Sequence, residues 1–171
     1  SSNIKMKIDL TGKNALVCGS TQGIGRAIAM EFAASGASVV LVARSEESLR
    51  AVLRALPASK TQNHNFIVAD FSDPESLRTK LHNFVTENPP VHILVNNTGG
   101  PKGGEILKAE TSEFEQTFRN HLICNHILVQ AVCEGMKKEN YGRIINIIST
   151  SVKQPIRNLG VSNTIRAAVA N

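Results

Sequence analysis

Tryptophan is absent from the 171 residues, tyrosine occurs once, at Tyr141, and aromatic residues together make up only 4% of the chain. Few rings are therefore available on which nucleic-acid bases could stack. The formal net charge of +5 comes from Lys and Arg residues that are scattered along the sequence. Nucleic acid is not expected as a partner, because a small phosphate-bearing ligand explains the positive excess equally well.

Cysteine is also scarce, and long apolar runs are missing. Cys18, Cys124 and Cys133 form no CxxC pair, which argues against a disulfide framework and favours a reducing, cytoplasmic location. The five histidines form no HxxxH or HExxH cluster, so no metal site is expected. No apolar run reaches the roughly 18 residues that a membrane-spanning helix needs, so no membrane association is expected.

Hydrophobic residues make up 42% of the chain and charged residues 19%, a balance typical of globular domains. The length predicts a single domain over residues 6–171, and residues 1–5 are treated as an appendage ahead of Met6. The chain ends at Asn171, one or two turns into an apolar helix that has no capping signal. We therefore expect it to be the N-terminal part of a longer protein, truncated at the C-terminus.

Apolar runs of strand length alternate with amphipathic runs of helix length. The expected strands are 14–18, 38–43, 65–69, 92–96 and 143–148, and the expected helices are 23–35, 46–56, 76–86, 112–138 and one starting near Ser162. Ser112 and Glu115 match a capping box at the start of the long helix. Several strands, including 143–148, are apolar on both faces, as in a parallel sheet that helices cover on both sides. The alternation predicts an α/β fold with a doubly wound, Rossmann-like parallel sheet.

A glycine-rich turn joins the first expected strand to the first expected helix. Glycine lets the backbone turn tightly and approach a pyrophosphate, whose charge lies at the helix N-terminus. The spacing is GxxxGxG rather than the common GxGxxG, so the strand–turn–helix context strengthens the assignment. A tight turn without a ligand is the alternative. The residues expected to hold a cofactor here are Gly19, Ser20, Gln22, Gly23, Ile24 and Gly25.

The second expected strand is followed by Arg44 and Ser45. A site for NAD usually carries an acidic residue here, which accepts a hydrogen bond from the ribose 2′-hydroxyl. Arginine instead suits a 2′-phosphate, through charge-assisted hydrogen bonds. The sequence therefore favours NADP as the cofactor, with a solvated Arg44 at the strand end as the alternative.

Two further segments complete a pattern with the glycine turn. Asp70 and Phe71 lie in VADFSD after the third strand, and Asn97, Thr98 and Gly99 follow the fourth strand in the run NNTG. Together the motifs resemble the classical short-chain dehydrogenase/reductase family, whose NNAG run has alanine where Thr98 stands. The opening run LTGKNALVCGSTQGIG is similar to that of the 3-oxoacyl-acyl-carrier-protein reductase-like members. The resemblance implies that these five residues bind the cofactor, with Asp70 contacting the adenine.

The family's chemistry uses Asn, Ser, Tyr and Lys, and the resemblance places Ser149 at the serine position. Ser162 stands where the tyrosine should be, and Arg166 stands where the lysine should be. Counting back from the fifth strand places His121 at the asparagine position, and a one-residue shift would restore Asn120. The substitutions matter because serine is a far weaker acid than a phenol of pKa about 10, and arginine stays protonated.

Three outcomes remain open for the chemistry. Hydride transfer could use another acid, such as His121 or a water polarised by Ser149. Arg166 and Ser149 could stabilise an oxyanion without protonating it. The protein could also bind NADP(H) without redox chemistry. Structural roles are the alternatives: Ser162 as the cap of the last helix, Arg166 as a solvated or ion-paired residue, and His121 as a buried helix residue.

The sequence thus predicts an NADP(H)-dependent oxidoreductase that reduces a carbonyl group, or oxidises an alcohol, of a small-molecule substrate with atypical catalytic residues. The alternative is a catalytically inactive NADP(H)-binding or regulatory protein on the same fold. The family resemblance further implies a homo-oligomer, either a dimer or a tetramer.

Overall fold

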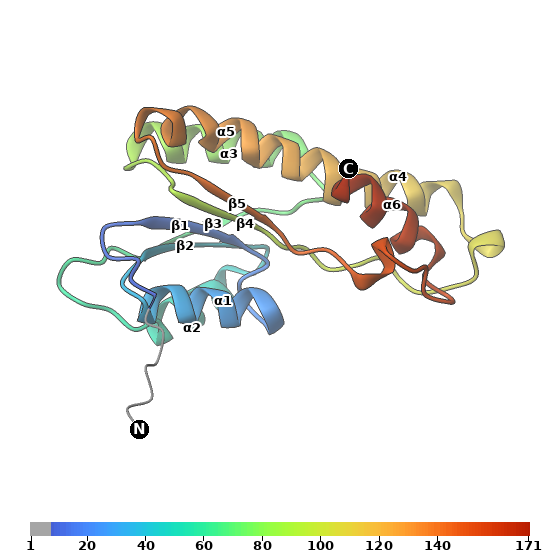
Figure 1. Cartoon of the computed structure of the whole chain (residues 1–171), viewed down its shortest axis with the longest axis horizontal. Helices are drawn as coiled ribbons and strands as arrows, with labels where there is room; N and C mark the ends of the chain where they lie inside the picture. The colour runs from blue at the N-terminus through green and yellow to red at the C-terminus, as the bar shows by residue number, and fades with distance from the viewer. Residues whose placement is uncertain (1–7) are drawn as a thin grey trace, which may run out of the picture.

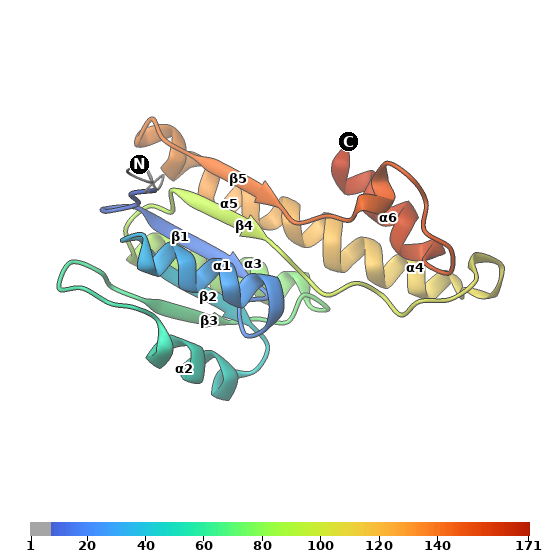
Figure 2. The same ribbon diagram turned by 60° about the horizontal axis from the view of Figure 1, so that its bottom comes forward.

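The computed structural model describes residues 8–171, so the appendage at residues 1–5 lies outside the described part of the chain. Five parallel strands form one sheet in the order β3-β2-β1-β4-β5 (Figure 2). Their bounds are β1 Asn14–Cys18, β2 Ser38–Ala43, β3 Asn65–Val68, β4 Ile93–Asn96 and β5 Arg143–Asn146. The chain runs outward from β1 to β3 and then returns to place β4 beside β1. The predicted doubly wound, Rossmann-like sheet is confirmed, and its topological switch point lies between β1 and β4.

Helices cover the sheet on both faces. Figure 1 shows α1 (Gly23–Ala34) and α2 (Glu46–Ala55) on one face, and α3 (Pro74–Glu87) and α5 (Cys124–Lys138) on the other. Because side chains alternate along a strand, β1 contributes Leu16 to the core under α3 and α5 and Val17 to the core on the opposite face. No described helix is both long enough and apolar enough to cross a membrane.

Local signals explain where the helices begin. The Ser45 side chain caps α2 by accepting a hydrogen bond from the Ser48 backbone N–H at 3.2 Å. Asp73 caps α3 by accepting from the Ser76 N–H at 3.1 Å, and Pro74 occupies the first turn. These caps fix both helices directly after the carboxyl ends of β2 and β3, where a ligand of such a sheet binds.

The long helix predicted over residues 112–138 is present, but it contains a π-helical turn that was not predicted. The segment consists of α4 (Thr111–Phe118), a π-helical turn (Arg119–Ile123) and α5. The capping box is formed by Glu110 and Glu113 rather than by Ser112 and Glu115, because the helix begins one residue earlier than predicted. The wider π turn shifts the register of the helix and carries His121 into the interior.

The final helix, α6 (Gly160–Ala170), also begins before its predicted start. Leu159 occupies the N-cap position, so Ser162 lies inside the first turn and does not cap the helix. Two short 3₁₀ helices, η1 (Ile106–Lys108) and η3 (Thr150–Val152), lie in the loops before α4 and α6. These loops pack against each other, since the Gly104 N–H donates to the Asn158 carbonyl at 2.7 Å.

The fifth strand is exposed, although its sequence predicted cover on both faces. Ile144 and Ile145 remain 42% and 40% exposed, whereas every residue of β4 is buried. Within the described chain β5 pairs only with β4, so it forms an edge of the sheet. Apolar composition alone does not distinguish an edge strand from a central one.

Candidate functional site

The glycine turn has the geometry that its residues predict. Gly19 and Gly23 adopt φ angles of +59° and +52°, a region that favours glycine. A Cβ atom at Gly25 would overlap the carbonyl oxygen of Gly19, so this position admits no side chain without a backbone shift. Ser20 is fully buried, and its hydroxyl accepts a hydrogen bond from the Val42 N–H at 3.0 Å. The turn is therefore held rigidly against β2.

The start of α1 is suited to an anion. Within residues 8–171 no side chain caps this end of the helix, and its first turn carries no acidic residue. The backbone N–H groups of the first turn are consequently available to a phosphate group, as at other helix N-termini that follow glycine-rich turns. At Gly23, nothing lies within 4 Å of the position that a Cβ atom would occupy, so a phosphate can approach the backbone closely.

A cleft of about 760 Å³ runs along the carboxyl ends of the strands from β3 to β4. Most residues predicted to bind the cofactor line it: Gly19, Gln22, Gly23, Ile24, Arg44, Ser45, Asp70, Phe71, Asn97, Thr98 and Gly99. The other two, Ser20 and Gly25, are buried and shape the turn beneath it. The cleft also includes residues that the sequence analysis did not select, namely Thr21, Val42, Ala43, Ala69, Gly100 and Asn120. Most of these additional residues are next in sequence to a predicted site residue, and that adjacency is the signal by which they could have been found.

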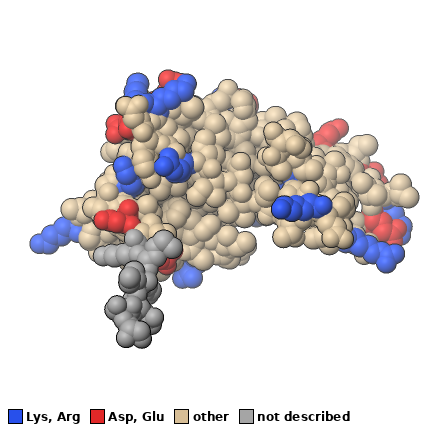
Figure 3. All heavy atoms as spheres, in the orientation of Figure 1, with Lys and Arg blue, Asp and Glu red and all other residues tan. Residues whose placement is uncertain are grey.

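Opposite charges flank the cleft beyond β2 and β3. Asp70 accepts a hydrogen bond from the Ser72 N–H at 2.9 Å, and this bond, together with the nearby Arg44 charge, lowers the pKa of the Asp70 carboxyl group. Both side chains are exposed, so each can reorient toward a ligand. Lys and Arg residues are spread over the molecular face shown in Figure 3 and are mixed with acidic residues. At the cleft itself, the Arg44 guanidinium is suited to contact a phosphate group.

Asn97 links β4 to the glycine turn. Its amide nitrogen lies 3.2 Å from the Cys18 carbonyl, to which it donates, and 3.4 Å from the Gly19 carbonyl. A Cβ atom at Gly19 would come within 2.7 Å of the same amide. This contact holds the loop after β4 against the glycine turn at the middle of the cleft.

Arg166 reaches from α6 to the ends of β4 and β5. Its guanidinium donates to the Ile147 carbonyl at 2.9 Å and to the Thr98 carbonyl at 3.3 Å. Within the described residues it has no carboxylate partner, and its Nε atom is buried without a hydrogen bond. Arg166 is therefore partly buried and, among the described residues, not ion-paired, and it joins the two loops that follow the strands.

His121 is only 3% exposed and lies near Arg166. Burial, and secondarily the Arg166 charge, lower the pKa of His121 to about 4, although the Gly99 carbonyl acts in the opposite direction. At neutral pH the imidazole is therefore uncharged. The expectation of a buried histidine is confirmed, and a role as a charged acid at neutral pH is disfavoured.

The remaining candidates lie around the same loops. Ser149 is partly buried, and its hydroxyl oxygen accepts a hydrogen bond from the Ser151 N–H at 3.1 Å, which leaves its own proton free to be donated. Ser162 is partly exposed and precedes Arg166 by one helical turn, so both lie on one face of α6. Asn120 also faces this region, since it lines the cleft and bonds to the Gln116 amide at 2.7 Å.

Acid should destabilise the fold partly through His121. Its pKa is about 4 in the native state and about 6.5 when unfolded, so the unfolded state takes up a proton first as the pH falls. The free energy of unfolding contributed by His121 should decline from pH 6.5 downward and level off near pH 4, by about 3 kcal/mol in total. The free energy of unfolding, measured with urea, should decline less between pH 7.5 and pH 4.5 in His121→Asn than in the original chain. The exposed His126→Asn variant should retain the full decline, and equal declines in all three proteins would contradict the assignment.

Comparison with known proteins agrees with the geometry. The family model described as short chain dehydrogenase matches residues 13–170. The chain belongs to the short-chain dehydrogenase family. It is 36% identical over 138 residues to 3-oxoacyl-acyl-carrier-protein reductase of Haemophilus influenzae, covering 81% of this chain and 55% of that relative. Identity to the Escherichia coli enzyme of the same name is 35% over 140 residues, covering 82% and 56%. The chain thus spans about half the length of the curated relatives that it matches.

Solved short-chain dehydrogenase structures have the same fold. L-sorbose reductase from Gluconobacter frateurii, complexed with NADPH and L-sorbose, superposes with a TM-score of 0.88 at 29% identity and covers 96% of this chain and 62% of its own. A 3-oxoacyl-acyl-carrier-protein reductase from Agrobacterium tumefaciens with NADP bound superposes with a TM-score of 0.86 at 25% identity, covering 95% and 62%. This short-chain dehydrogenase therefore shares its fold with proteins that hold a nicotinamide cofactor.

Proposed function

We propose that the protein is an NADP(H)-dependent oxidoreductase that reduces the carbonyl group of a small molecule, or oxidises the corresponding alcohol. The observation that carries the proposal is the cleft that joins the glycine turn to Arg44 along the strand ends. The turn is suited to the pyrophosphate, and the Arg44 guanidinium is suited to a 2′-phosphate. Two solved relatives that contain NADPH or NADP support this choice of cofactor.

NADPH supplies a hydride to the carbonyl carbon when it is bound, and a proton must then reach the oxygen to give the alcohol. Ser149 is assigned the hydrogen bond to the substrate oxygen, because its hydroxyl proton is uncommitted. Neutral His121 can donate a hydrogen bond while a water molecule delivers the proton. The permanent charge of Arg166 favours developing negative charge nearby. Ser162 lies one helical turn from Arg166 and is assigned a second hydroxyl contact.

A catalytically inactive NADP(H)-binding or regulatory protein is the second candidate. The bonds of Arg166 favour it, because the guanidinium already donates to the Thr98 and Ile147 carbonyls. An arginine held in this way cannot relay a proton. In this alternative the nucleotide is bound, but carbonyl compounds are not reduced.

Titration and turnover together test the proposal. The affinities for NADPH and NADH should be measured from the change in nucleotide fluorescence on binding. We expect NADPH to bind at least about 10-fold more tightly, a difference in binding free energy of about 1.4 kcal/mol. NADPH consumption should then be measured over ketones, hydroxyketones and acyl thioesters. Tight NADPH binding without turnover of any compound would favour the inactive alternative. Equal affinity for both nucleotides would refute the preference for NADP.

A further inference from the structure

A second cavity adjoins the nucleotide cleft on the side of β4. It has a volume of about 420 Å³ and shares Gly99, Gly100 and Asn120 with the cleft. Because Arg44 follows β2 on the other side of β1, this cavity lies at the end of the cleft remote from the proposed 2′-phosphate position. The volume falls within the range of small-molecule pockets. A ligand here would adjoin the nucleotide and His121.

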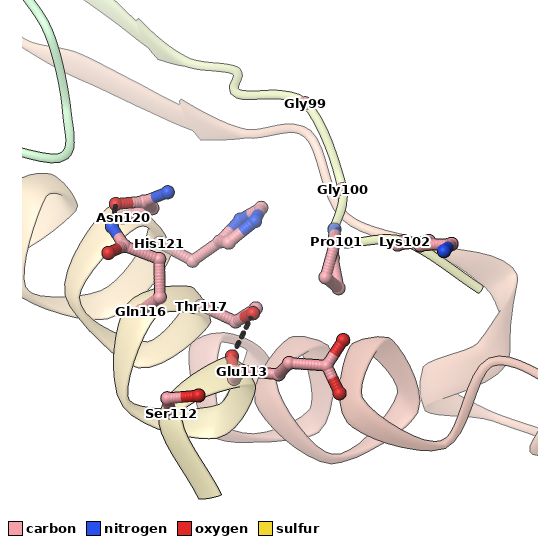
Figure 4. Close-up of a pocket in the computed structure, with 10 residues that line it drawn as sticks. All are labelled: Gly99, Gly100, Pro101, Lys102, Ser112, Glu113, Gln116, Thr117, Asn120 and His121. Atoms are coloured by element: carbon pink, nitrogen blue, oxygen red, sulfur yellow. Dashed lines mark hydrogen bonds between the residues drawn. The ribbon is translucent and has the colours of Figure 1, made fainter. Parts of the chain in front are cut away.

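The side chains that face this cavity are nearly all polar. Figure 4 shows them on two walls, the loop after β4 on one side and α4 with the π turn on the other. Beyond the glycines, Pro101 is the only apolar lining residue. The polar groups comprise an ammonium, a carboxylate, two amides, two hydroxyls and the imidazole of His121. Such groups can donate to and accept from the hydroxyls of a ligand, whereas an alkyl chain would cover them without replacing their hydrogen bonds to water.

Some of these groups are already committed, and others are free. The Thr117 hydroxyl donates to the Glu113 carbonyl at 2.6 Å, and the Glu113 carboxylate accepts from the Glu110 N–H at 2.9 Å. Lys102 and Ser112, by contrast, have no hydrogen-bond or ion-pair partner among residues 8–171. Free donors on opposite walls match a ligand that presents several hydroxyl oxygens.

The two walls are held in place by the rest of the fold. The loop after β4 is fixed to the start of α6, where a Cβ atom at Gly160 would overlap Ile106. The capping box at Glu110 and Glu113 fixes the start of α4 on the other wall. The cavity is consequently preformed, and a polar ligand need not order the loop when it binds.

From this lining we infer that the substrate is a small, hydroxyl-rich carbonyl compound, such as a ketose or polyhydroxyketone, and not a long acyl thioester. The inference rests on the proposed function. In this assignment Lys102 and Ser112 contact the substrate hydroxyls. Gln116 accepts from a substrate hydroxyl through its Oε1, since its amide nitrogen donates to Asn120 at 2.7 Å. His121 lies at the inner end of the cavity beside the nucleotide. These contacts determine substrate specificity.

Saturation-transfer NMR with a six-carbon ketose, in the presence of NADP⁺, tests the inference without requiring turnover. The chain should transfer saturation to the ketose, and Gln116→Leu should weaken ketose binding by about 10-fold while leaving the NADPH dissociation constant unchanged. Glu115→Leu is the matched control, because Glu115 is exposed on the same helix outside the cavity and its replacement should change neither constant.

Three results would separate the inference from the proposed function. Preference for a 2-alkanone or a butyryl thioester over the ketose, with NADPH still bound, would overturn the substrate class alone. Unchanged ketose binding in Gln116→Leu would overturn the assignment of the cavity. Failure of NADPH to bind the original chain would instead overturn the proposed function, and ketose binding would then test the cavity by itself.

Discussion

Replacing Arg44 with Asp should weaken NADPH binding by about 100-fold or more while changing NADH affinity by less than about 3-fold. The guanidinium is exposed at the carboxyl end of β2 and lines the cleft. Its loss removes charge-assisted hydrogen bonds of about 1.5–3 kcal/mol, and the new carboxylate repels a 2′-phosphate. Fluorescence titration with both nucleotides measures the two changes.

The control for Arg44→Asp is Arg54→Asp, because Arg54 is also an exposed arginine and lies at the far end of α2 from the cleft. This variant makes the same change in net charge, so a general electrostatic effect would appear in both proteins. Equal losses of NADPH and NADH affinity in Arg44→Asp would show that the substitution damages the site as a whole and does not change its cofactor preference. That result would remove Arg44 from the recognition of the phosphate.

Replacing Gly25 with Ala should abolish detectable binding of both nucleotides, a loss of at least about 100-fold. The added Cβ atom would overlap the Gly19 carbonyl, and backbone cannot yield as a flexible side chain can. Forcing α1 away from the glycine turn should also lower the free energy of unfolding by about 1–3 kcal/mol. Titration measures the first effect and urea unfolding the second.

Gly104→Ala provides the matched control for Gly25→Ala. Nothing lies within 4 Å of the place that a Cβ atom would take at Gly104, its φ angle is not positive, and its N–H is retained in alanine. This variant should keep the nucleotide affinity and stability of the original chain. If Gly25→Ala bound NADPH as tightly as Gly104→Ala, the turn would not be the pyrophosphate site.

Much of the fold could be predicted because its signals are local. The bounds of β1 and β2 agree with the sequence prediction at both ends, since each strand is an apolar run that begins at a polar residue and is followed by Gly19 or Arg44. The residues of the cleft were also predictable, because the carboxyl ends of parallel strands converge at one edge of the sheet.

The features that were missed depend on distant parts of the chain. The π turn around His121 does not follow from helical periodicity, because packing against other elements determines where a helix widens. The partners of Arg166 are backbone carbonyls, which have no signature in the sequence. The polar cavity joins Lys102 to Gln116 across a loop, so it exists only once the chain has folded.

The exposed edge of β5 affects the self-association of the purified protein. The unpaired edge of a strand presents backbone donors and acceptors that can template pairing with another chain, and isoleucine side chains strengthen such pairing. For the 171-residue chain as given, we therefore expect self-association by strand addition at β5. A lysine or proline placed in β5 would be the rational means of keeping the protein dispersed.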